Sequence, residues 1–116
     1  MKNSEIRFRV ELDDSNIPDK IFWEATDGPT IGLQEARAIT VSVWDHIQQE
    51  TLRIDLWGKE MTVEEMKRFY IDTIGGMAQS IRTSTNDEFM SKEIDNLCNR
   101  LVEHLKKENK KSEEGK

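Results

Sequence analysis

The two histidines, His46 and His104, and the single cysteine, Cys98, are the first candidates for chemistry in this chain. A zinc site needs several such ligands clustered at short spacing, and these three side chains make no such cluster. We therefore predict no metal site, and a lone cysteine cannot form an intramolecular disulfide. Cys98 also lies between Leu97 and Leu101 on an apolar stripe, where a thiol behaves as a small hydrophobic group.

One grouping could perform acid/base chemistry: the carboxylates Asp45 and Asp55, with Arg53 and His46 nearby. The chain has 23 acidic residues, so such a grouping is expected by chance, and a solvated, salt-bridged sheet face is the favoured interpretation. No serine has the G-x-S-x-G context of an acyl-transfer nucleophile. Gly75 and Gly76 lack the preceding strand and following lysine of a phosphate loop. The sequence thus predicts neither enzyme activity nor a cofactor.

The charge of the chain limits its partners. The formal net charge is −6 and the pI is about 5.0, so the diffuse field repels nucleic-acid phosphates and anionic lipids. The N-terminus is charged, and no apolar run is long enough for a signal peptide or a membrane span. We therefore predict a cytoplasmic protein without direct membrane insertion and without a nucleic-acid partner.

Four segments alternate apolar and polar residues, with the period of half-buried strands. They cover residues 5–12, 21–25, 37–44 and 51–57. A turn over residues 13–20 joins the first two strands, whereas residues 26–35, with two glycines and a proline, are predicted to be a loop. The last two strands are close in sequence and are predicted to form a hairpin.

The hairpin register can be tested by the side of the sheet that each residue occupies. If Trp44 faces Thr51, paired residue numbers sum to 95 and six apolar residues share one face. A slip by one residue would mix apolar and polar residues on both faces. The opposite face is then polar and carries two tryptophans, with Trp44, Trp57, Arg53 and Asp55 as its distinctive members. Tryptophan is enriched in interface hot spots, so these four residues are the predicted partner-binding site. A competing interpretation is that the loop over residues 26–35 folds over the tryptophans.

Two helices follow the strands. Thr62 with Glu65, and Thr85 with Glu88, match the capping box that begins a helix. Apolar residues recur behind each box at three- and four-residue steps. The fold class predicted is α+β, a four-stranded mainly antiparallel sheet followed by two C-terminal helices packed on one face. We predict a single domain over residues 1–105 and a charged disordered tail over residues 106–116, which contain no apolar residue.

Several stretches resemble the family of the gliding-motility protein GldC, known from bacteria of the Bacteroidetes group. They are KIFWEATD, ITVSVWDH, TLRIDLWGKEMTVEEMKRFY and STNDEFM, and the resemblance covers nearly all of residues 3–105. Its most specific part includes Trp44, Asp45, Arg53, Asp55, Trp57 and Tyr70. The resemblance implies a cytoplasmic accessory component of gliding motility, a process tied to a cell-envelope motor and a secretion apparatus. It implies no catalytic activity and assigns no site residue.

Two classes of function remain open at this point. The leading hypothesis is a non-catalytic interaction module that presents the tryptophan face to a protein partner, such as another gliding-machinery component, or to a second copy in a homo-oligomer. The alternative is a peptide- or small-molecule-binding module with a pocket between the sheet and the 26–35 loop, or a chaperone-like module associated with protein secretion that binds extended chains at a strand edge.

Overall fold

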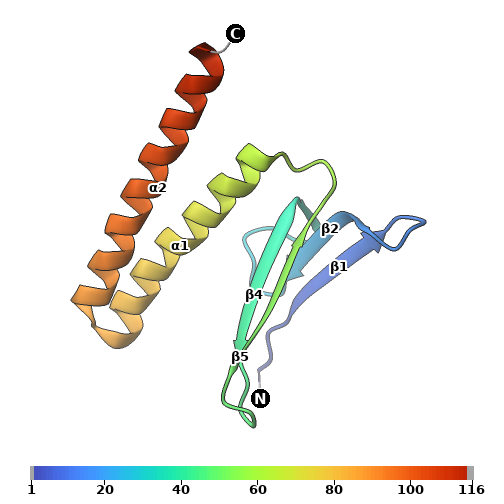
Figure 1. Cartoon of the computed structure of the whole chain (residues 1–116). Helices are drawn as coiled ribbons and strands as arrows, with labels where there is room; N and C mark the ends of the chain where they lie inside the picture. The colour runs from blue at the N-terminus through green and yellow to red at the C-terminus, as the bar shows by residue number, and fades with distance from the viewer. Residues whose placement is uncertain (1, 115–116) are drawn as a thin grey trace. The chain divides into compact units, whose positions relative to one another are not determined.

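A computed structural model describes residues 2–114 of the chain, and side chains up to residue 111. Its contacts divide the chain into two compact units, residues 1–62 and residues 63–116. The first unit contains β1 (Ile6–Leu12), β2 (Pro18–Ala25), β3 (Gln34–Ala36), β4 (Ala38–Trp44) and β5 (Thr51–Trp57), and the second contains α1 (Val63–Thr85) and α2 (Glu88–Glu114) (Figure 1). An α+β content is confirmed, while one domain over residues 1–105 and helices packed on a sheet face stay predictions.

The first sheet is antiparallel, with strand order β1-β2-β3. Phe8 pairs with Trp23 and Val10 pairs with Ile21, so the alternation along β1 places its apolar residues beside those of β2. Ile21 also pairs with Ala36 of β3 and is completely buried. The core of this unit is therefore centred on Ile21, where β2 is flanked on both edges.

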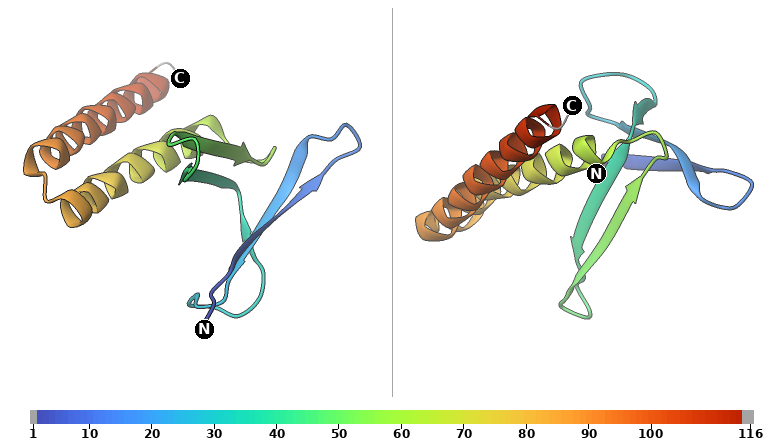
Figure 2. Two further views of the ribbon diagram at one scale, coloured as in Figure 1. Left: turned by 90° about the horizontal axis from the view of Figure 1, so that it is seen from below. Right: turned by 45° about the horizontal axis from the view of Figure 1, so that its top comes forward.

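The second sheet is the antiparallel hairpin β4–β5, whose strands lie side by side in Figures 1 and 2. Trp44 pairs with Thr51, and Val41 pairs with Ile54, so every paired number sums to 95 as predicted. The apolar residues of both strands share one face because side chains alternate along a strand. Its members are Ile39, Val41, Val43, Leu52, Ile54 and Leu56.

The structure has these two small sheets in place of the predicted four-stranded sheet. The chain bends at Arg37, between β3 and β4. Residues before the bend pair with β2 and residues after it pair with β5. The segment predicted as one strand from residue 37 is therefore the second half of an interrupted strand, and its first half, β3, lies within and just beyond the predicted 26–35 loop.

The second unit is an antiparallel helical hairpin, and α1 and α2 lie side by side in every view (Figures 1 and 2). Small residues occupy the contact between them. Ser91 is fully buried and donates a 2.9 Å hydrogen bond from Oγ to the carbonyl of Ala78, which is itself buried. A side chain added at Gly75 would meet Cys98 Sγ at 3.8 Å. Helix α1 runs through both glycines without a break.

The cap of α2 differs from the predicted capping box. Thr85 is the last residue of α1, and its hydroxyl donates to the carbonyl of Ile81. Asn86 has a left-handed backbone with φ of 60°, which ends α1, and Asp87 Oδ1 then accepts a 3.0 Å bond from the backbone N–H of Met90. Asp87 is therefore the residue that caps α2, because α1 continues to Thr85 and keeps that residue in the first helix.

Helix α2 continues to Glu114, nine residues beyond the boundary predicted at Leu105. The predicted tail thus differs from the structure over residues 106–114, while residues 115–116 of that tail lie outside the described residues. Side-chain contacts at helical spacing reach the first turn of this part: His104 Nε2 lies 2.7 Å from Glu108, and Lys106 pairs with Glu103. Such pairs stabilise a helix without burial of apolar side chains, whereas the predicted end rests on the apolar stripe alone.

Candidate functional site

The polar face of the β4–β5 hairpin carries the four residues predicted to bind a partner. Arg53, Asp55 and Trp57 come from β5, and Trp44 is the last residue of β4. Strand alternation directs all four to the same side, opposite the apolar face. The structure therefore brings the predicted residues onto one surface, which we call the tryptophan face, together with Thr40 and Ser42.

The centre of the tryptophan face is a hydrogen-bonded group around Asp55. Thr40 donates a 2.5 Å hydrogen bond from its hydroxyl to Asp55 Oδ1, and Arg53 Nη2 lies 2.9 Å from Asp55 Oδ2. The Thr40 bond is the main cause that lowers the pKa of the Asp55 carboxyl, and the Arg53 bond lowers it further, against partial desolvation that raises it. Asp55 is thus held as a carboxylate whose two oxygens already have partners.

The two tryptophans mark opposite ends of this face. Trp44 pairs with Thr51 beside the hairpin turn, whereas Trp57 pairs with Ala38 at the other end. The Trp44–Thr51 pair and the Ala38–Trp57 pair are six residue positions apart, which corresponds to about 20 Å along the strands. Trp44 is 67% exposed and Trp57 is 49% exposed, so the loop after β2 does not cover them. The tryptophans of one chain therefore form two anchors rather than one cluster.

The candidate acid/base pair is not assembled. Asp45 lies in the hairpin turn, where Oδ2 accepts hydrogen bonds from the backbone N–H groups of Ile47 at 3.1 Å and Gln48 at 2.6 Å. Asp45 lies opposite Glu50, and Asp55 lies five positions beyond Glu50. The two carboxylates are therefore about 17 Å apart along the strand. Asp45 therefore shapes the turn, and His46 is an exposed residue of the same turn.

Sequence reasoning missed a charged cluster on the helical hairpin. Glu108 lies 2.7 Å from His104 Nε2 and 2.8 Å from Lys67 Nζ, so one carboxylate joins α2 to α1. The bond from Lys67 is the main cause that lowers the pKa of Glu108. The four-residue spacing of His104 and Glu108 is visible in the sequence, but the approach of Lys67 depends on how the helices pair. Cys98, half-buried, lies on the α1 side of α2 with Sγ 3.9 Å from the carbonyl of Ile71.

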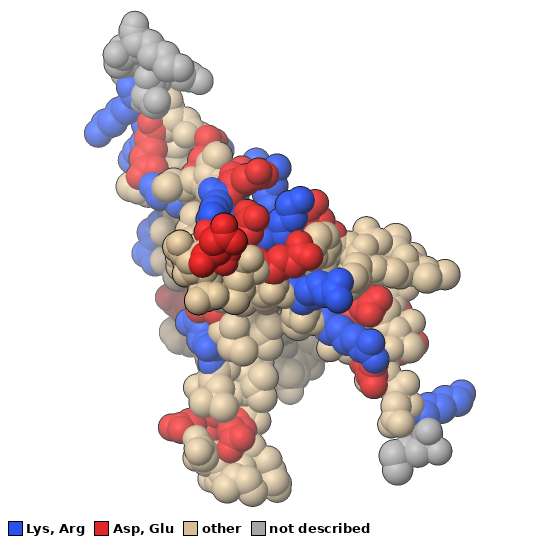
Figure 3. Space-filling model, turned by 90° about the vertical axis from the view of Figure 1, so that its right-hand side faces the viewer, with Lys and Arg blue, Asp and Glu red and all other residues tan. Residues whose placement is uncertain are grey.

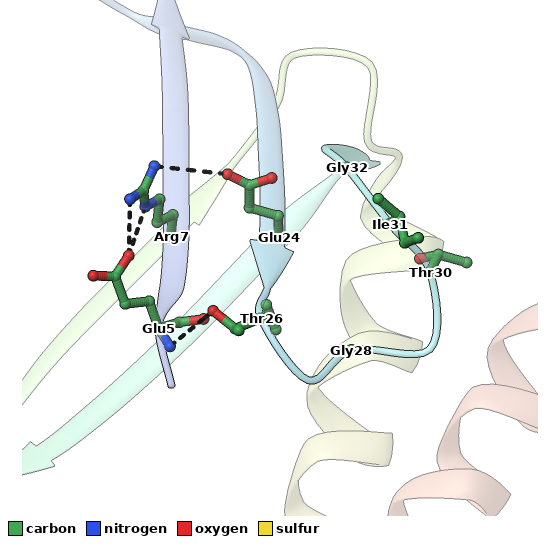
Figure 4. A pocket seen from close by; sticks show the side chains of 9 residues that line it. Glu5, Arg7, Glu24, Thr26, Gly28, Thr30, Ile31 and Gly32 are labelled. Carbon is green, nitrogen blue, oxygen red and sulfur yellow. Dashed lines mark hydrogen bonds and ion pairs between the residues drawn. The ribbon is translucent and has the colours of Figure 1, made fainter. Parts of the chain in front are cut away.

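A pocket of about 270 Å³ lies between the ends of β1 and β2 and the loop after β2 (Figure 4). Arg7 points at two carboxylates there, with Nη2 2.8 Å from Glu5 and Nη1 4.0 Å from Glu24. The hydrogen bond with Glu5 is the main cause that raises the pKa of Arg7. Thr26 bonds the backbone of Glu5, and Ile31 on the loop is fully exposed. The pocket is open to solvent, and its charged groups are paired with one another.

Charges of both signs are interspersed on the face drawn in Figure 3, where Lys and Arg side chains stand beside Asp and Glu. Within the part of the chain that the structure describes, no three histidine, cysteine or acidic side chains gather into a group that could hold a metal ion. Neither described helix is both long enough and apolar enough to cross a membrane.

Comparison with known proteins identifies the family of this chain. The family described as gliding motility-associated protein GldC-like matches residues 18–107, which begin with β2 and include every later strand and most of both helices. The predicted resemblance also included β1, which lies before this match. Searches among curated proteins and among solved structures gave no match. The matched region covers most of the chain, and the protein belongs to the GldC-like family of gliding motility-associated proteins.

Proposed function

We propose that this protein is a non-catalytic, cytoplasmic accessory component of gliding motility that acts by binding another protein through its tryptophan face. The family supports the process, because its members are gliding motility-associated. The exposure of Trp44 and Trp57 on one polar face is the observation that supports the mode of action. Large aromatic side chains left in water beside an arginine have the composition of an interface hot spot.

The alternative pocket after β2 has weaker support. A ligand site usually offers a few polar groups with free bonding capacity in a concave, mostly apolar cavity. In this pocket the Arg7 guanidinium is already engaged by Glu5 and Glu24, and Thr26 is engaged by the backbone of Glu5. A ligand would have to displace these pairs. On the tryptophan face the charged groups are paired as well, but Trp44 and Trp57 are exposed and a partner can cover them without displacing an ion pair, so this face is the better candidate.

The test is a double variant, Trp44→Ser with Trp57→Ser, expressed in the native cell and used as bait for affinity capture. We expect the variant to keep its far-UV circular dichroism and melting temperature but to lose its captured partner and to fail to restore gliding. A matched control, Ile31→Ser with Ile47→Ser, removes two side chains that are even more exposed, at 101% and 84%, outside this face.

Three results would contradict the proposal. Unfolding of the tryptophan variant would mean that the rings belong to a core. An unchanged set of captured proteins together with normal gliding would mean that the face binds nothing that motility requires. Loss of capture in both the variant and the control would indicate a general effect of reduced surface hydrophobicity rather than a specific face.

A further inference from the structure

The outer edge of β5 has unpaired backbone groups. Hydrogen bonds from Asp45 N to Glu50 O and from Gly58 N to Arg37 O bracket the β4–β5 ladder, and both join residues whose numbers sum to 95. Hydrogen-bonded pairs recur at every second position of an antiparallel ladder. Val43–Leu52, Val41–Ile54 and Ile39–Leu56 are therefore the bonded pairs, and their backbone groups point into the space between β4 and β5. The backbone N–H and C=O groups of the alternate residues then point away from β4. They are Thr51, Arg53, Asp55 and Trp57.

No described strand pairs with this edge, because the second sheet contains only β4 and β5. The β4–β5 ladder has no register shift, and β5 contains neither glycine nor proline, so the edge is regular over seven residues. By contrast, β1 has an irregularity between Glu11 and Leu12 that interrupts its ladder. Long, regular edges are templates for pairing with another strand.

The charges along β5 are complementary to those of a second copy of β5 that runs antiparallel to it. A two-fold axis through Ile54 would pair residues whose numbers sum to 108, so Arg53 would face Asp55 of a second copy, twice. A shift by two residues in either direction would place Arg53 against Arg53 or Asp55 against Asp55. A shift by one residue would place apolar side chains beside polar ones. Only the register centred on Ile54 pairs all seven residues and opposes unlike charges.

We propose that the chain forms a two-fold symmetric dimer in which β5 pairs antiparallel with β5 of a second copy. The paired hairpins form one four-stranded sheet in the order β4-β5-β5-β4. This inference goes beyond the proposed function, since it names a second copy as the occupant of the edge and leaves the face free for another partner.

The dimer changes what the tryptophan face presents. Trp44 pairs with Thr51 in its own hairpin, and Thr51 faces Trp57 of the second copy in the register centred on Ile54. Trp44 of one copy and Trp57 of the other therefore lie in the same row across the sheet, two strand spacings or about 10 Å apart. The two-fold axis generates a second row of the same kind. The anchors that lie about 20 Å apart in one chain become neighbours across the dimer. The opposite face gathers the apolar side chains of both hairpins.

Cysteine cross-linking tests the register directly, in a Cys98→Ser background that leaves no other thiol. Arg53–Asp55 would be a bonded pair across the axis, so Ile54 would face Ile54 in a non-bonded pair with Cα atoms about 4.5 Å apart. That distance suits a disulfide. We expect Ile54→Cys to form a covalent dimer on mild oxidation. Leu52→Cys is the matched control, because it lies on the same face with similar exposure, 50% against 56%.

The control should remain uncross-linked because Leu52 would face Leu56 of the second copy. The two Leu52 positions would be four residues out of register, about 13 Å apart along the strands and beyond the reach of a disulfide. Cross-linking of Val41→Cys in place of Ile54→Cys would assign the contact to the β4 edge and overturn the proposal. A wild-type mass equal to one chain in sedimentation equilibrium at about 100 μM, where even weak dimers are populated, would also overturn it.

A charge exchange gives a second test that does not depend on oxidation. The variant Arg53→Asp opposes aspartates across the axis, and the variant Asp55→Arg opposes arginines, so each alone should dimerise at least about tenfold more weakly than wild type. A mixture of the two restores an unlike pair at every position, and we expect heterodimers at wild-type affinity. Circular dichroism checks that Asp55→Arg folds without its Thr40 bond. Two folded variants that fail to associate when mixed would refute the pairing. A dimer that persists in the tryptophan variant while capture is lost separates this inference from the proposed function.

Discussion

Gly76 offers a direct test of how α1 is built. It lies in the interior of a 23-residue helix, and a Cβ added there would have no heavy atom within 4 Å apart from its chain neighbours and the adjacent backbone of its own helix. Glycine in a helix interior is about 1 kcal/mol less favourable than alanine because it loses more backbone entropy on folding. The substitution Gly76→Ala should therefore raise the free energy of unfolding by about 1 kcal/mol. For a chain of this size that corresponds to a rise in melting temperature of roughly 4 °C.

The assay is urea unfolding followed by circular dichroism at the helical band, at one fixed protein concentration so that any association contributes equally. Gly75→Ala is the matched control, because its new methyl group would meet Cys98 Sγ at an ordinary contact distance of 3.8 Å. We expect it to give a similar gain. A decrease in stability for Gly76→Ala would refute the reasoning, since it would mean that this position is neither open nor regular helix.

Two further predictions concern single hydrogen bonds. Thr40→Val removes the main cause of the lowered pKa of Asp55, so this pKa should rise toward its ordinary value. NMR titration of the Asp55 carboxyl carbon measures it. Thr51→Val is the control and should leave the pKa of Asp55 unchanged. Because the pKa of Asp55 is lowered on folding, its contribution to stability is present at neutral pH and is lost as the pH falls through the folded pKa; this acid-dependent loss should be smaller in Thr40→Val. Asp87→Ala removes the cap of α2 and should cost about 1 kcal/mol in urea unfolding, whereas Asp87→Asn keeps an accepting oxygen and should cost less; equal losses would contradict the capping role.

The β4–β5 hairpin could be predicted in full because its signal is local. The strands alternate with a strict period of two, and only one register places all apolar residues together. The same parity argument assigns Trp44 and Trp57 to the opposite face from the residue order alone. Short-range patterns of this kind determine both the pairing and the face.

The division into two sheets could not be predicted in the same way. Gln34–Ala36 has no alternating pattern and becomes a strand because β2 offers an edge to it, which is a contact far away in sequence. The bend at Arg37 likewise depends on two different neighbours, β2 before it and β5 after it. Propensity is overridden by tertiary context at such positions.

The helix ends show a related limit. Thr85 and Asp87 are both good capping residues, and the sequence alone does not decide which one begins α2. The choice follows from the left-handed Asn86, which allows α1 to continue to Thr85 and leaves only Asp87 to cap the next helix. Lys67 and Glu108 similarly meet only because the two helices form an antiparallel hairpin.

The exposed surface of the first unit links the dimer to the proposed function. Ile21 is the only buried apolar side chain among the described residues of this unit, and Val43, Leu52 and Ile54 of the hairpin are each at least half exposed. A two-stranded sheet is only marginally stable in water, whereas a sheet of three or more strands with one apolar face can be stable when that face is covered. In the proposed dimer, pairing through β5 adds the two strands of the second hairpin to the sheet and at the same time places the tryptophans of the two copies in common rows. A partner that contacts both Trp44 of one copy and Trp57 of the other would therefore bind the dimer more tightly than the single chain, so its affinity should fall whenever the Arg53–Asp55 pairing across the axis is broken.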